Sequence, residues 1–396
     1  MTSSLGILGL RRVRARDNSA RGRVATPLEL LFDLVFVVAV SQASVNLHHL
    51  LAEGHIGDGV LSYLMVFFAI WWAWVNFTWF ASAFDTDDWA YRIVTIVQMG
   101  GVLVLAAGIH DAMVSQDFFW VTWGYVIMRL AMVAQWVRAA VSDPGYRATA
   151  WTFAVGITIV QVLWVARIYL LDARWQLITF FVLMVAEIAV PVIAESRRAT
   201  PWHPHHIAER YGLFTLILLG ESLLASATAI FEAVGEGEHV GELVWLAVSG
   251  LVVAAGMWWI YFAREPAERL TSSRAGFFFG YGHYLVFAAA GAVSAGVEVE
   301  VDHILGTAHL DAEAAGLALT IPVAVFLVFT WLLVLRGSLS VPASVAVLGG
   351  AVLILFAGML PVAEYAVAAV LLVLVVAAVE ADAVVRRRRN GFEHAI

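Results

Sequence analysis

The stretch Ala25-Thr-Pro-Leu-Glu-Leu-Leu-Phe-Asp-Leu-Val-Phe-Val-Val-Ala-Val40 decides the fold class, because it is apolar enough to cross a membrane and yet contains two carboxylates. Glu29 and Asp33 are four residues apart, so they lie on one face of a helix, about one turn from each other. Thr26 suits the cap of this helix and Pro27 its first position. A charge at membrane depth costs at least about 2.5–3.5 kcal/mol on insertion scales. Other helices must therefore supply partners for both carboxylates.

The composition is that of an integral membrane protein. Of the 396 residues, 62% are hydrophobic and 14% are charged, whereas soluble domains have about 45–50% apolar and about 25% charged residues. The chain has no cysteine, which excludes disulfides and thiolate chemistry. It also lacks the motifs of phosphate loops, nucleophile elbows and zinc proteases. We expect no enzymatic activity, no cofactor and no nucleic-acid partner; the expected partners are the lipid bilayer and an unknown small solute or ion, and a homodimer is left open.

Twelve apolar segments predict an all-α bundle of about twelve transmembrane helices. About 20 apolar residues are needed to cross roughly 30 Å of hydrocarbon. The predicted segments are 27–50, 60–83, 91–112, 119–140, 148–170, 175–195, 207–231, 241–263, 275–297, 315–335, 341–357 and 361–381. Segment 341–357 is short and contains Gly349-Gly350, so whether the last two segments are separate spans is left open.

The arginines predict the orientation of this bundle. Cytoplasmic loops are enriched in basic residues, and with the N-terminus inside, 19 of the 23 arginines fall on the inner side. These are the six of the N-terminal tail, Arg92, Arg138, Arg147, Arg197, Arg198, Arg264, Arg269, Arg274, Arg336 and Arg386 to Arg389. The outer loops are acidic or neutral and contain Glu232, Glu236, Glu238, Glu242, Glu298, Glu300, Asp302, Asp311 and Glu313. Both termini are therefore predicted to be cytoplasmic.

The chain divides on this pattern into an Arg-rich, flexible cytoplasmic tail (1–24), two six-helix units (25–198 and 199–385) and a basic tail (386–396). Trp71-Trp72 and Trp258-Trp259 are separated by the same offset, 187 residues, as Asp111 and Glu298. Since the first and seventh helices begin on the same side, the two units would be parallel repeats. Double tryptophans are also common in aromatic belts, so a chain without duplication is the alternative.

Polar residues on five predicted helices lie at a similar depth near the inner side. At 1.5 Å per residue, Asp33, Gln98 and His283 are about 9, 10 and 12 Å from the inner ends of their helices. The full set is Glu29, Asp33, Asn76, Gln98, His206, Glu209, Arg210 and His283. We interpret the set as the lining of a polar inner cavity. The alternative is that its members pair off structurally, for instance Asp33 with Arg210.

Glu221 lies about 20 Å into the seventh predicted helix, in the sequence Leu219-Gly-Glu-Ser222. A carboxylate near the middle of a membrane, next to Ser222, is a candidate proton or cation site. It lies within about 20° of Arg210 on a helical wheel. The structural alternative is a protonated acid that hydrogen-bonds to a neighbouring helix.

Two further groups of residues favour structural roles. Arg129 and Glu187 are both about 15 Å from the outer ends of their helices, so equal depth and opposite charge predict a buried ion pair. The run His203-Pro-His205-His206 contains metal-binding residue types, but nothing fixes three ligands in one geometry, so we expect no metal site.

Three long sequence blocks resemble those of the bacterial low temperature requirement A (LtrA) family. They are Thr26-Pro-Leu-Glu-Leu-Leu-Phe-Asp-Leu-Val-Phe-Val37, then Trp71-Trp-Ala-Trp-Val-Asn-Phe-Thr-Trp79 with Phe84-Asp-Thr-Asp-Asp88, and His206-Ile-Ala-Glu-Arg-Tyr-Gly-Leu-Phe214 with Leu219-Gly-Glu-Ser222. The resemblance covers about residues 24–300 and implies a polytopic bacterial membrane protein of a family named for growth in the cold. It implies no substrate.

Three functions remain open on the sequence. The first is a secondary, proton-coupled transporter of an unknown solute, favoured by the number of spans and by Asp33, Glu209 and Glu221. The second is a cation or proton channel; Phe32-Asp33 faintly resembles the Phe-Ser-Asp motif of lysosomal-type potassium channels, without its serine. The third is a membrane sensor or scaffold linked to growth in the cold.

The predicted topology can be tested with a single cysteine at Ala308, in the predicted outer loop 298–314. We expect an impermeant thiol reagent to label Ala308→Cys in intact cells, because most arginines then lie inside. Protection of this position, together with labelling of a cysteine near Arg388, would reverse the assignment.

Overall fold

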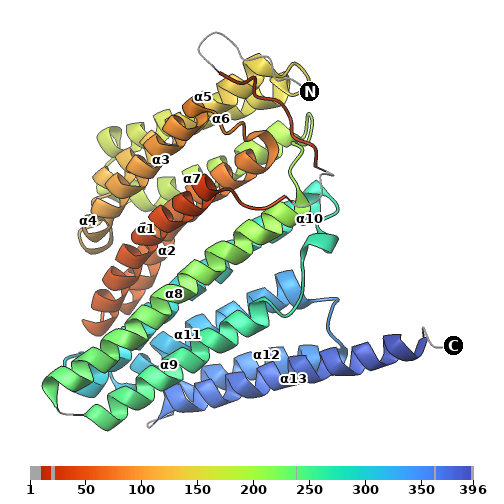
Figure 1. Cartoon of the computed structure of the whole chain (residues 1–396). Helices are drawn as coiled ribbons and strands as arrows, with labels where there is room; N and C mark the ends of the chain where they lie inside the picture. The colour runs from red at the N-terminus through yellow and green to blue at the C-terminus, as the bar shows by residue number, and fades with distance from the viewer. Residues whose placement is uncertain (1–9, 19–22, 238, 361–362, 394–396) are drawn as a thin grey trace. The chain divides into compact units, whose positions relative to one another are not determined.

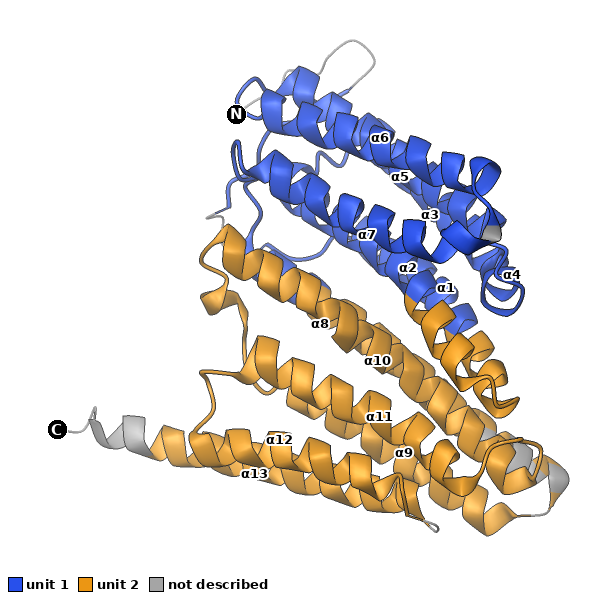
Figure 2. Cartoon of the chain, turned by 180° about the vertical axis from the view of Figure 1, so that it is seen from behind, with its two compact units in different colours: residues 1–43, 65–210 blue, residues 44–64, 211–396 orange. Residues whose placement is uncertain are grey.

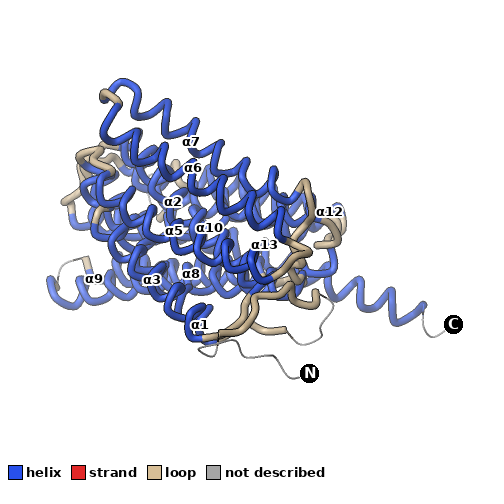
Figure 3. The backbone as a smooth tube through the Cα atoms, turned by 90° about the horizontal axis from the view of Figure 1, so that it is seen from above, coloured by secondary structure: helices blue, strands red, loops and turns tan. Residues whose placement is uncertain are grey.

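The structure, a computed structural model, describes residues 10–18, 23–237, 239–360 and 363–393, and this part of the chain contains helices and no strand (Figures 1 and 3). The first seven α-helices are α1 (Pro27–Ala52), α2 (Ile56–Phe84), α3 (Trp89–Ala107), α4 (Ile109–Val114), α5 (Phe119–Ser142), α6 (Arg147–Leu170) and α7 (Ala173–Glu195). The remaining six are α8 (Pro204–Glu236), α9 (Val240–Tyr261), α10 (Ser273–Leu305), α11 (Ala312–Thr330), α12 (Val341–Ala357) and α13 (Glu364–Glu393). A 3₁₀ turn, η2 (Ala267–Arg269), precedes α10, and a π-helical turn, η3 (Trp331–Leu335), continues α11.

The prediction of a polytopic helical membrane protein is confirmed. Among the described residues, 10 helices are long and apolar enough to cross a membrane, namely α1, α2, α3, α6, α7, α8, α9, α10, α11 with its π-helical turn, and α13. The two other predicted spans correspond to α5 and α12. Helix α12 has only 17 residues, and α5 is long enough but contains Arg129, Gln135 and Arg138.

Helix α1 is polar on its buried face and apolar on its exposed face. Glu29 and Asp33 are 1% and 0% exposed, whereas Leu30, Leu34 and Val38 are between 37% and 55% exposed. A helix in water has the opposite arrangement. Surrounding lipid therefore explains this distribution better than water does.

Several predicted helix ends are wrong. Helix α10 continues to Leu305, so Glu298, Glu300 and Asp302 belong to a helix and not to an outer loop. The third predicted span breaks at Gly108 into α3 and α4. This glycine lies against the backbone of α5, where a side chain would collide with Trp120. Of the predicted acidic loop, Glu238 and the side chains of Glu232 and Glu236 lie outside the described part of the chain.

The chain forms two compact units (Figure 2). Unit 1 consists of residues 1–43 and 65–210, and unit 2 of residues 44–64 and 211–396. The boundary falls inside α1, α2 and α8, so neither unit is a continuous piece of sequence. Trp71 and Trp72 are buried, whereas Trp258 and Trp259 are 43% and 46% exposed, so the two tryptophan pairs have different surroundings. The parallel repeat stays a prediction.

Small residues bring the helices of each unit into close contact. In unit 1, a Cβ on Gly124 of α5 would lie 2.6 Å from the Gly101 carbonyl oxygen of α3. In unit 2, a Cβ on Gly296 of α10 would lie 2.6 Å from the Leu319 Cα of α11. Both pairs require glycine, because lipid supplies no hydrophobic force between helices and close packing must hold them together.

The described part of the N-terminal tail is bound to unit 1, so the prediction of a flexible tail is wrong for these residues. The Arg11 N–H donates to Asp88 Oδ2 (3.0 Å) and the Ala15 N–H donates to Asp143 Oδ2 (2.9 Å). Arg16 pairs with Asp85 (3.3 Å). Burial alone would raise the pKa of Asp88, but its hydrogen bonds from Arg138, Tyr91 and Arg11 outweigh burial and hold the pKa below its usual value.

The ion pair predicted between Arg129 and Glu187 is present in unit 1 and is completely buried. Arg129 of α5 donates to Glu187 Oε2 of α7 at 2.9 Å. The same oxygen accepts a hydrogen bond from Trp72 Nε1 (3.1 Å), and Glu187 Oε1 accepts one from Gln161 Nε2 (2.7 Å). One carboxylate thereby joins helices α2, α5, α6 and α7. A buried ion pair is stabilising only when such extra hydrogen bonds complete it.

Removing either partner of this pair should destabilise the protein. We expect Arg129→Ala and Glu187→Ala each to lower the free energy of unfolding by about 3–5 kcal/mol, because each leaves an uncompensated buried charge. The double variant should recover part of that loss. Unfolding in mixed detergent micelles measures all three, with Arg174→Ala as the matched control, since the Arg174 side chain is 76% exposed. Additive single effects would show that the two residues do not interact.

Candidate functional site

A buried cluster of charged residues lies in unit 1, where α1 and α8 begin. The start of α1 is a capping box, in which the Thr26 Oγ1 accepts from the Glu29 N–H (3.3 Å) and Glu29 Oε2 accepts from the Thr26 N–H (2.8 Å). This reciprocal capping satisfies backbone N–H groups that the helix itself leaves unpaired. It also fixes the Glu29 side chain against the helix, with its second oxygen available to other residues.

Arg210 of α8 lies between the two carboxylates of α1. Its Nη1 is 2.9 Å from Glu29 Oε1 and its Nη2 is 2.5 Å from Asp33 Oδ1. Thr78 Oγ1 of α2 lies 3.5 Å from the same Nη2. The Arg210 and Asp33 side chains are 0% exposed and that of Glu29 is 2% exposed. The four-residue spacing of Glu29 and Asp33 thus allows one guanidinium to bind both carboxylates.

Asp33 has two oxygens in different surroundings. Oδ1 accepts hydrogen bonds from Trp74 Nε1 (2.7 Å) and from Arg210 (2.5 Å). Oδ2 is buried and has no hydrogen-bond partner among the described residues. A buried oxygen without a donor is unfavourable for an ionised carboxylate, whereas a protonated carboxyl needs fewer donors. Oδ2 is therefore a candidate oxygen for a proton in this cluster.

His206 extends the cluster by one turn of α8. Its Nε2 lies 3.1 Å from Glu29 Oε1, and its side chain is 1% exposed. The preceding turn is also anchored, since the His203 N–H donates to Ser82 Oγ at 3.0 Å. Glu209 lies at the edge of the cluster and accepts a hydrogen bond from the Ala25 N–H at 3.1 Å. The block His206 to Arg210 therefore contacts the start of α1 through three side chains.

Taken alone, Glu29, Asp33 and Arg210 carry one negative charge in excess, which one additional proton would balance; Arg23 is a further cation that interacts electrostatically with Glu29. Glu29 and Asp33 would contribute two negative charges when ionised, and Arg210 contributes one positive charge. A proton on Asp33 makes the set of Glu29, Asp33 and Arg210 neutral. A proton on His206 makes the set of these three residues and His206 neutral. Since uncompensated charge is costly at membrane depth, the arrangement is suited to bind and release one proton.

The other predicted residues of the inner cavity have contacts of their own. Asn76 is buried in unit 1 and donates to the Trp72 carbonyl of its own helix (2.7 Å), and Gln98 is buried in α3. His283 belongs to unit 2, where its Nε2 is 2.9 Å from the Tyr261 hydroxyl and its Nδ1 is 2.7 Å from the Phe279 carbonyl. With both ring nitrogens bonded in this way, His283 fits a neutral structural histidine. A single cavity lined by the whole set stays a prediction.

Glu221 and Ser222 lie on the part of α8 that belongs to unit 2. Glu221 is partly exposed, and Ser222 is buried. The Ser222 carbonyl accepts from Ser226 Oγ at 2.9 Å, while the Ser222 Oγ has no hydrogen-bond partner within the described residues. Their roles in an ion pathway stay predictions.

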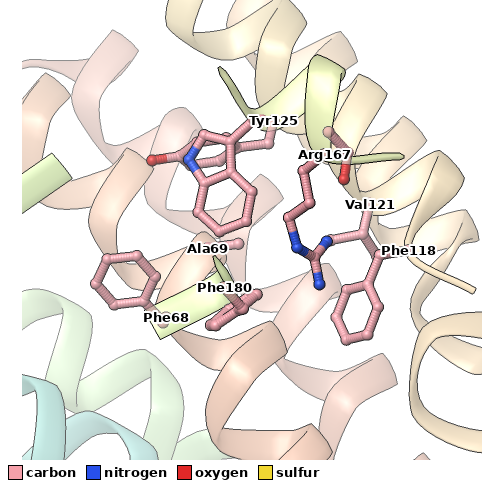
Figure 4. Close-up of a pocket in the computed structure, with 9 residues that line it drawn as sticks. Phe68, Ala69, Phe118, Val121, Tyr125, Arg167 and Phe180 are labelled. Carbon is pink, nitrogen blue, oxygen red and sulfur yellow. The ribbon is translucent and has the colours of Figure 1, made fainter. Parts of the chain in front are cut away.

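Arg167 is a buried cation that the sequence did not single out as a site. Its guanidinium carbon is 5.6–5.7 Å from the ring centres of Phe118, Trp164 and Phe180, and its Nη2 donates to the Gln176 carbonyl at 2.8 Å. Figure 4 shows the side chain extending toward the Phe118 ring. The cavity beside it measures only about 20 Å³, roughly the room of one water molecule. Aromatic faces and a carbonyl therefore hold this charge, and a solute does not fit.

Arg210 should be essential for the stability of unit 1. We expect Arg210→Ala to lower the free energy of unfolding by about 3–5 kcal/mol, because it leaves two carboxylates buried without a cation. Arg210→Ala combined with Asp33→Asn should recover part of this loss. Arg174→Ala, a surface pair at 3.8 Å, serves as control and should change stability by about 0–1 kcal/mol. An Arg210→Ala protein as stable as this control would contradict the assignment.

The comparisons with known proteins agree with the resemblance in the sequence blocks. A family model described as bacterial low temperature requirement A protein (LtrA) matches residues 24–379, which includes all three blocks and continues well beyond residue 300. The chain is also 28% identical over 303 residues to an uncharacterized protein of Rhizobium meliloti (strain 1021), and the match covers 70% of each chain. This multi-pass membrane protein belongs to the bacterial low temperature requirement A family.

Proposed function

We propose that the protein is a proton-coupled secondary transporter of a small solute in the bacterial inner membrane, with both termini in the cytoplasm. One observation carries the proposal: a fully buried arginine pairs with two carboxylates, Glu29 and Asp33, so one additional proton would balance the charge of these three side chains. A purely structural ion pair needs one acid for one base, as Arg129 and Glu187 illustrate. The second acid beside Arg210 is the feature that a proton site explains.

The proposed cycle uses Asp33 as the group that takes up the proton. Protonation on Oδ2 neutralises the carboxyl and weakens its attraction to Arg210, which then remains paired with Glu29. Because Asp33 and Glu29 are on α1 and Arg210 is on α8, this change alters what holds the two helices together. A transporter needs such a change of partner in order to couple proton binding to movement between inward-open and outward-open states.

His206 and Glu221 have supporting roles in the proposal. His206 lies 3.1 Å from Glu29 Oε1 and can exchange a proton with this end of the cluster. Glu221 follows Arg210 on α8 by eleven residues and is proposed as the second carrier of the transported charge. Ser222 beside it supplies a buried hydroxyl.

A channel is the alternative for an ion pathway, and it differs from a transporter in turnover. The residues that would line its inner part, Glu29, Asp33 and Arg210, are 0–2% exposed and bonded to one another. A pore needs such groups to face water, so the geometry favours a transporter. Unitary currents in a planar bilayer would decide for the channel.

The test measures proton movement in proteoliposomes with a pH-sensitive dye, against a panel of small solutes. We expect Asp33→Asn and Glu221→Gln to abolish flux driven by a pH gradient while the protein stays folded, since each variant mimics a permanently protonated acid. Asp58→Asn is the matched control, because Asp58 is exposed at the start of α2, and it should retain full flux.

Two outcomes would contradict the proposal in different ways. A well-folded Asp33→Asn protein with full gradient-driven flux would remove Asp33 from the mechanism. A well-folded Glu221→Gln protein with full flux would leave Glu221 as a hydrogen-bonded structural acid, with Asp33 still in place as the proton carrier.

A further inference from the structure

Two buried acids of unit 2 come together near the end of α10. Glu300 lies five residues before the end of α10, and Glu364 is the first residue of α13. Glu300 is 0% exposed and Glu364 is 5% exposed. The two side chains are within hydrogen-bonding reach of each other. This pair was not predicted from the sequence, because Glu300 was predicted to lie in a loop.

The packing of α10 against α11 explains why the two acids meet. Gly296 of α10 faces Leu319 of α11, where a Cβ on the glycine would lie 2.6 Å from the Leu319 Cα. Consecutive helices joined by a short loop run antiparallel. Glu300 is one turn after Gly296 on α10, and Gly316 is about one turn before Leu319 on α11, so Glu300 and Gly316 lie at the same level. A Cβ on Gly316 would lie 2.9 Å from the Glu364 Cγ. The glycine therefore leaves the space that the Glu364 side chain occupies beside Glu300.

No cation among the described residues pairs with these two acids. Within the part of the chain that the structure describes, neither oxygen of Glu300 accepts a hydrogen bond from an N–H or O–H group of a neighbouring residue. No arginine or histidine among those residues forms an ion pair with either acid.

The charged neighbours on the surrounding elements include groups engaged in other contacts, further acids and one histidine of α10, His303. His48 of α1 pairs with Glu298 (3.3 Å) and Asp302 (2.7 Å) on α10. Asp311 caps α11 by accepting from the Ala314 N–H. Further titratable side chains on these elements are Glu242 at the start of α9, His303 at the end of α10, Glu313 at the start of α11 and Tyr365 next to Glu364. The acidic neighbours add negative potential, so they increase the need for a positive charge at the pair.

Two ionised carboxylates in contact repel each other strongly where water is excluded. The repulsion disappears when one of them carries a proton, because the O–H of one then donates to the other. Glu364 is at the N-terminus of α13, where the helix dipole favours a negative charge. Glu300 is further from the helix N-termini, at the opposite end of α10, where the dipole disfavours a negative charge.

We propose that Glu300 and Glu364 form a proton-binding site. Glu300 carries the proton, and its O–H donates a hydrogen bond to the carboxylate of Glu364. This site is separate from the Arg210 cluster, and its existence does not depend on transport. The shared proton holds α10 to α13. When the proton is lost as the pH rises, two adjacent negative charges remain and the contact between these helices weakens.

The test detects the proton directly, by difference infrared spectroscopy of the carbonyl stretch of protonated carboxyl groups in the purified full-length protein. At neutral pH the wild-type protein should have a protonated carboxyl band that Glu300→Gln removes. Glu313→Gln, an exposed acid at the start of α11, is the matched control and should retain the band. Any protonated Asp33 contributes equally to all three spectra, so failure of the transport proposal does not affect this result.

A second measurement follows the melting temperature as a function of pH. The wild-type Tm should fall by several degrees between neutral and alkaline pH, because the stabilising proton is bound below the transition and lost above it. Glu300→Gln and Glu364→Gln should both flatten this dependence, since the amide supplies a permanent donor. If either variant fails to fold, the other variant and the wild-type spectrum still decide the question.

Two results would overturn the proposal. The first is a wild-type spectrum at neutral pH without any protonated carboxyl band that Glu300→Gln or Glu364→Gln removes. The second is a wild-type Tm that rises on adding sodium chloride at constant pH, but not on adding choline chloride, and does not rise in Glu300→Gln. That result would assign the site to a small metal cation.

Discussion

The structure of unit 1 depends on one constraint, the need to satisfy a guanidinium group that is enclosed at membrane depth. Water cannot hydrogen-bond Arg210 there, so the chain must supply every partner. Glu29 and Asp33 provide two anions one turn apart on α1, and Trp74 of α2 donates a hydrogen bond to Asp33. The start of α1, the middle of α2 and the first turns of α8 are thereby fixed to one another by polar bonds in place of hydrophobic attraction.

Two further buried acids, Glu187 and Glu300, also need their charge to be compensated, and each is compensated differently. At Glu187 the acid has one arginine and two neutral donors, so its charge is compensated within the chain. At Glu300 no base or donor is within reach among the described residues, and an external proton takes that part. Arg210 lies between these extremes, with one base for two acids. The number of bases per acid, and not burial alone, separates structural pairs from candidate proton sites in this protein.

The sequence predicted the helical membrane architecture and the pairing of Arg129 with Glu187, and it offered the pairing of Asp33 with Arg210 as an alternative, because charged residues in apolar segments must find partners of opposite charge at the same depth. It did not predict Trp72, Trp74 or Gln161 as hydrogen-bond donors. A tryptophan in an apolar helix does not reveal in the sequence which way its N–H points. Depth along a helix is also only one coordinate, so His283 matched the inner cluster by depth and yet lies among aromatic rings of unit 2. The acids at the end of α10 resembled a loop, although the helix continues through them.

The bound N-terminal segment has a consequence for how the protein is made. It leaves the ribosome before any helix, yet its acceptors Asp88 and Asp143 follow it by 77 and 128 residues. Contacts between residues so distant in sequence form late, after the chain between them has been ordered. Arg11 and Ala15 are therefore among the last residues of unit 1 to reach their place. The contact with Asp143 can form only after α5 has been synthesised, so the contacts of this segment with Asp88 and Asp143 mark a unit 1 whose first five helices are complete.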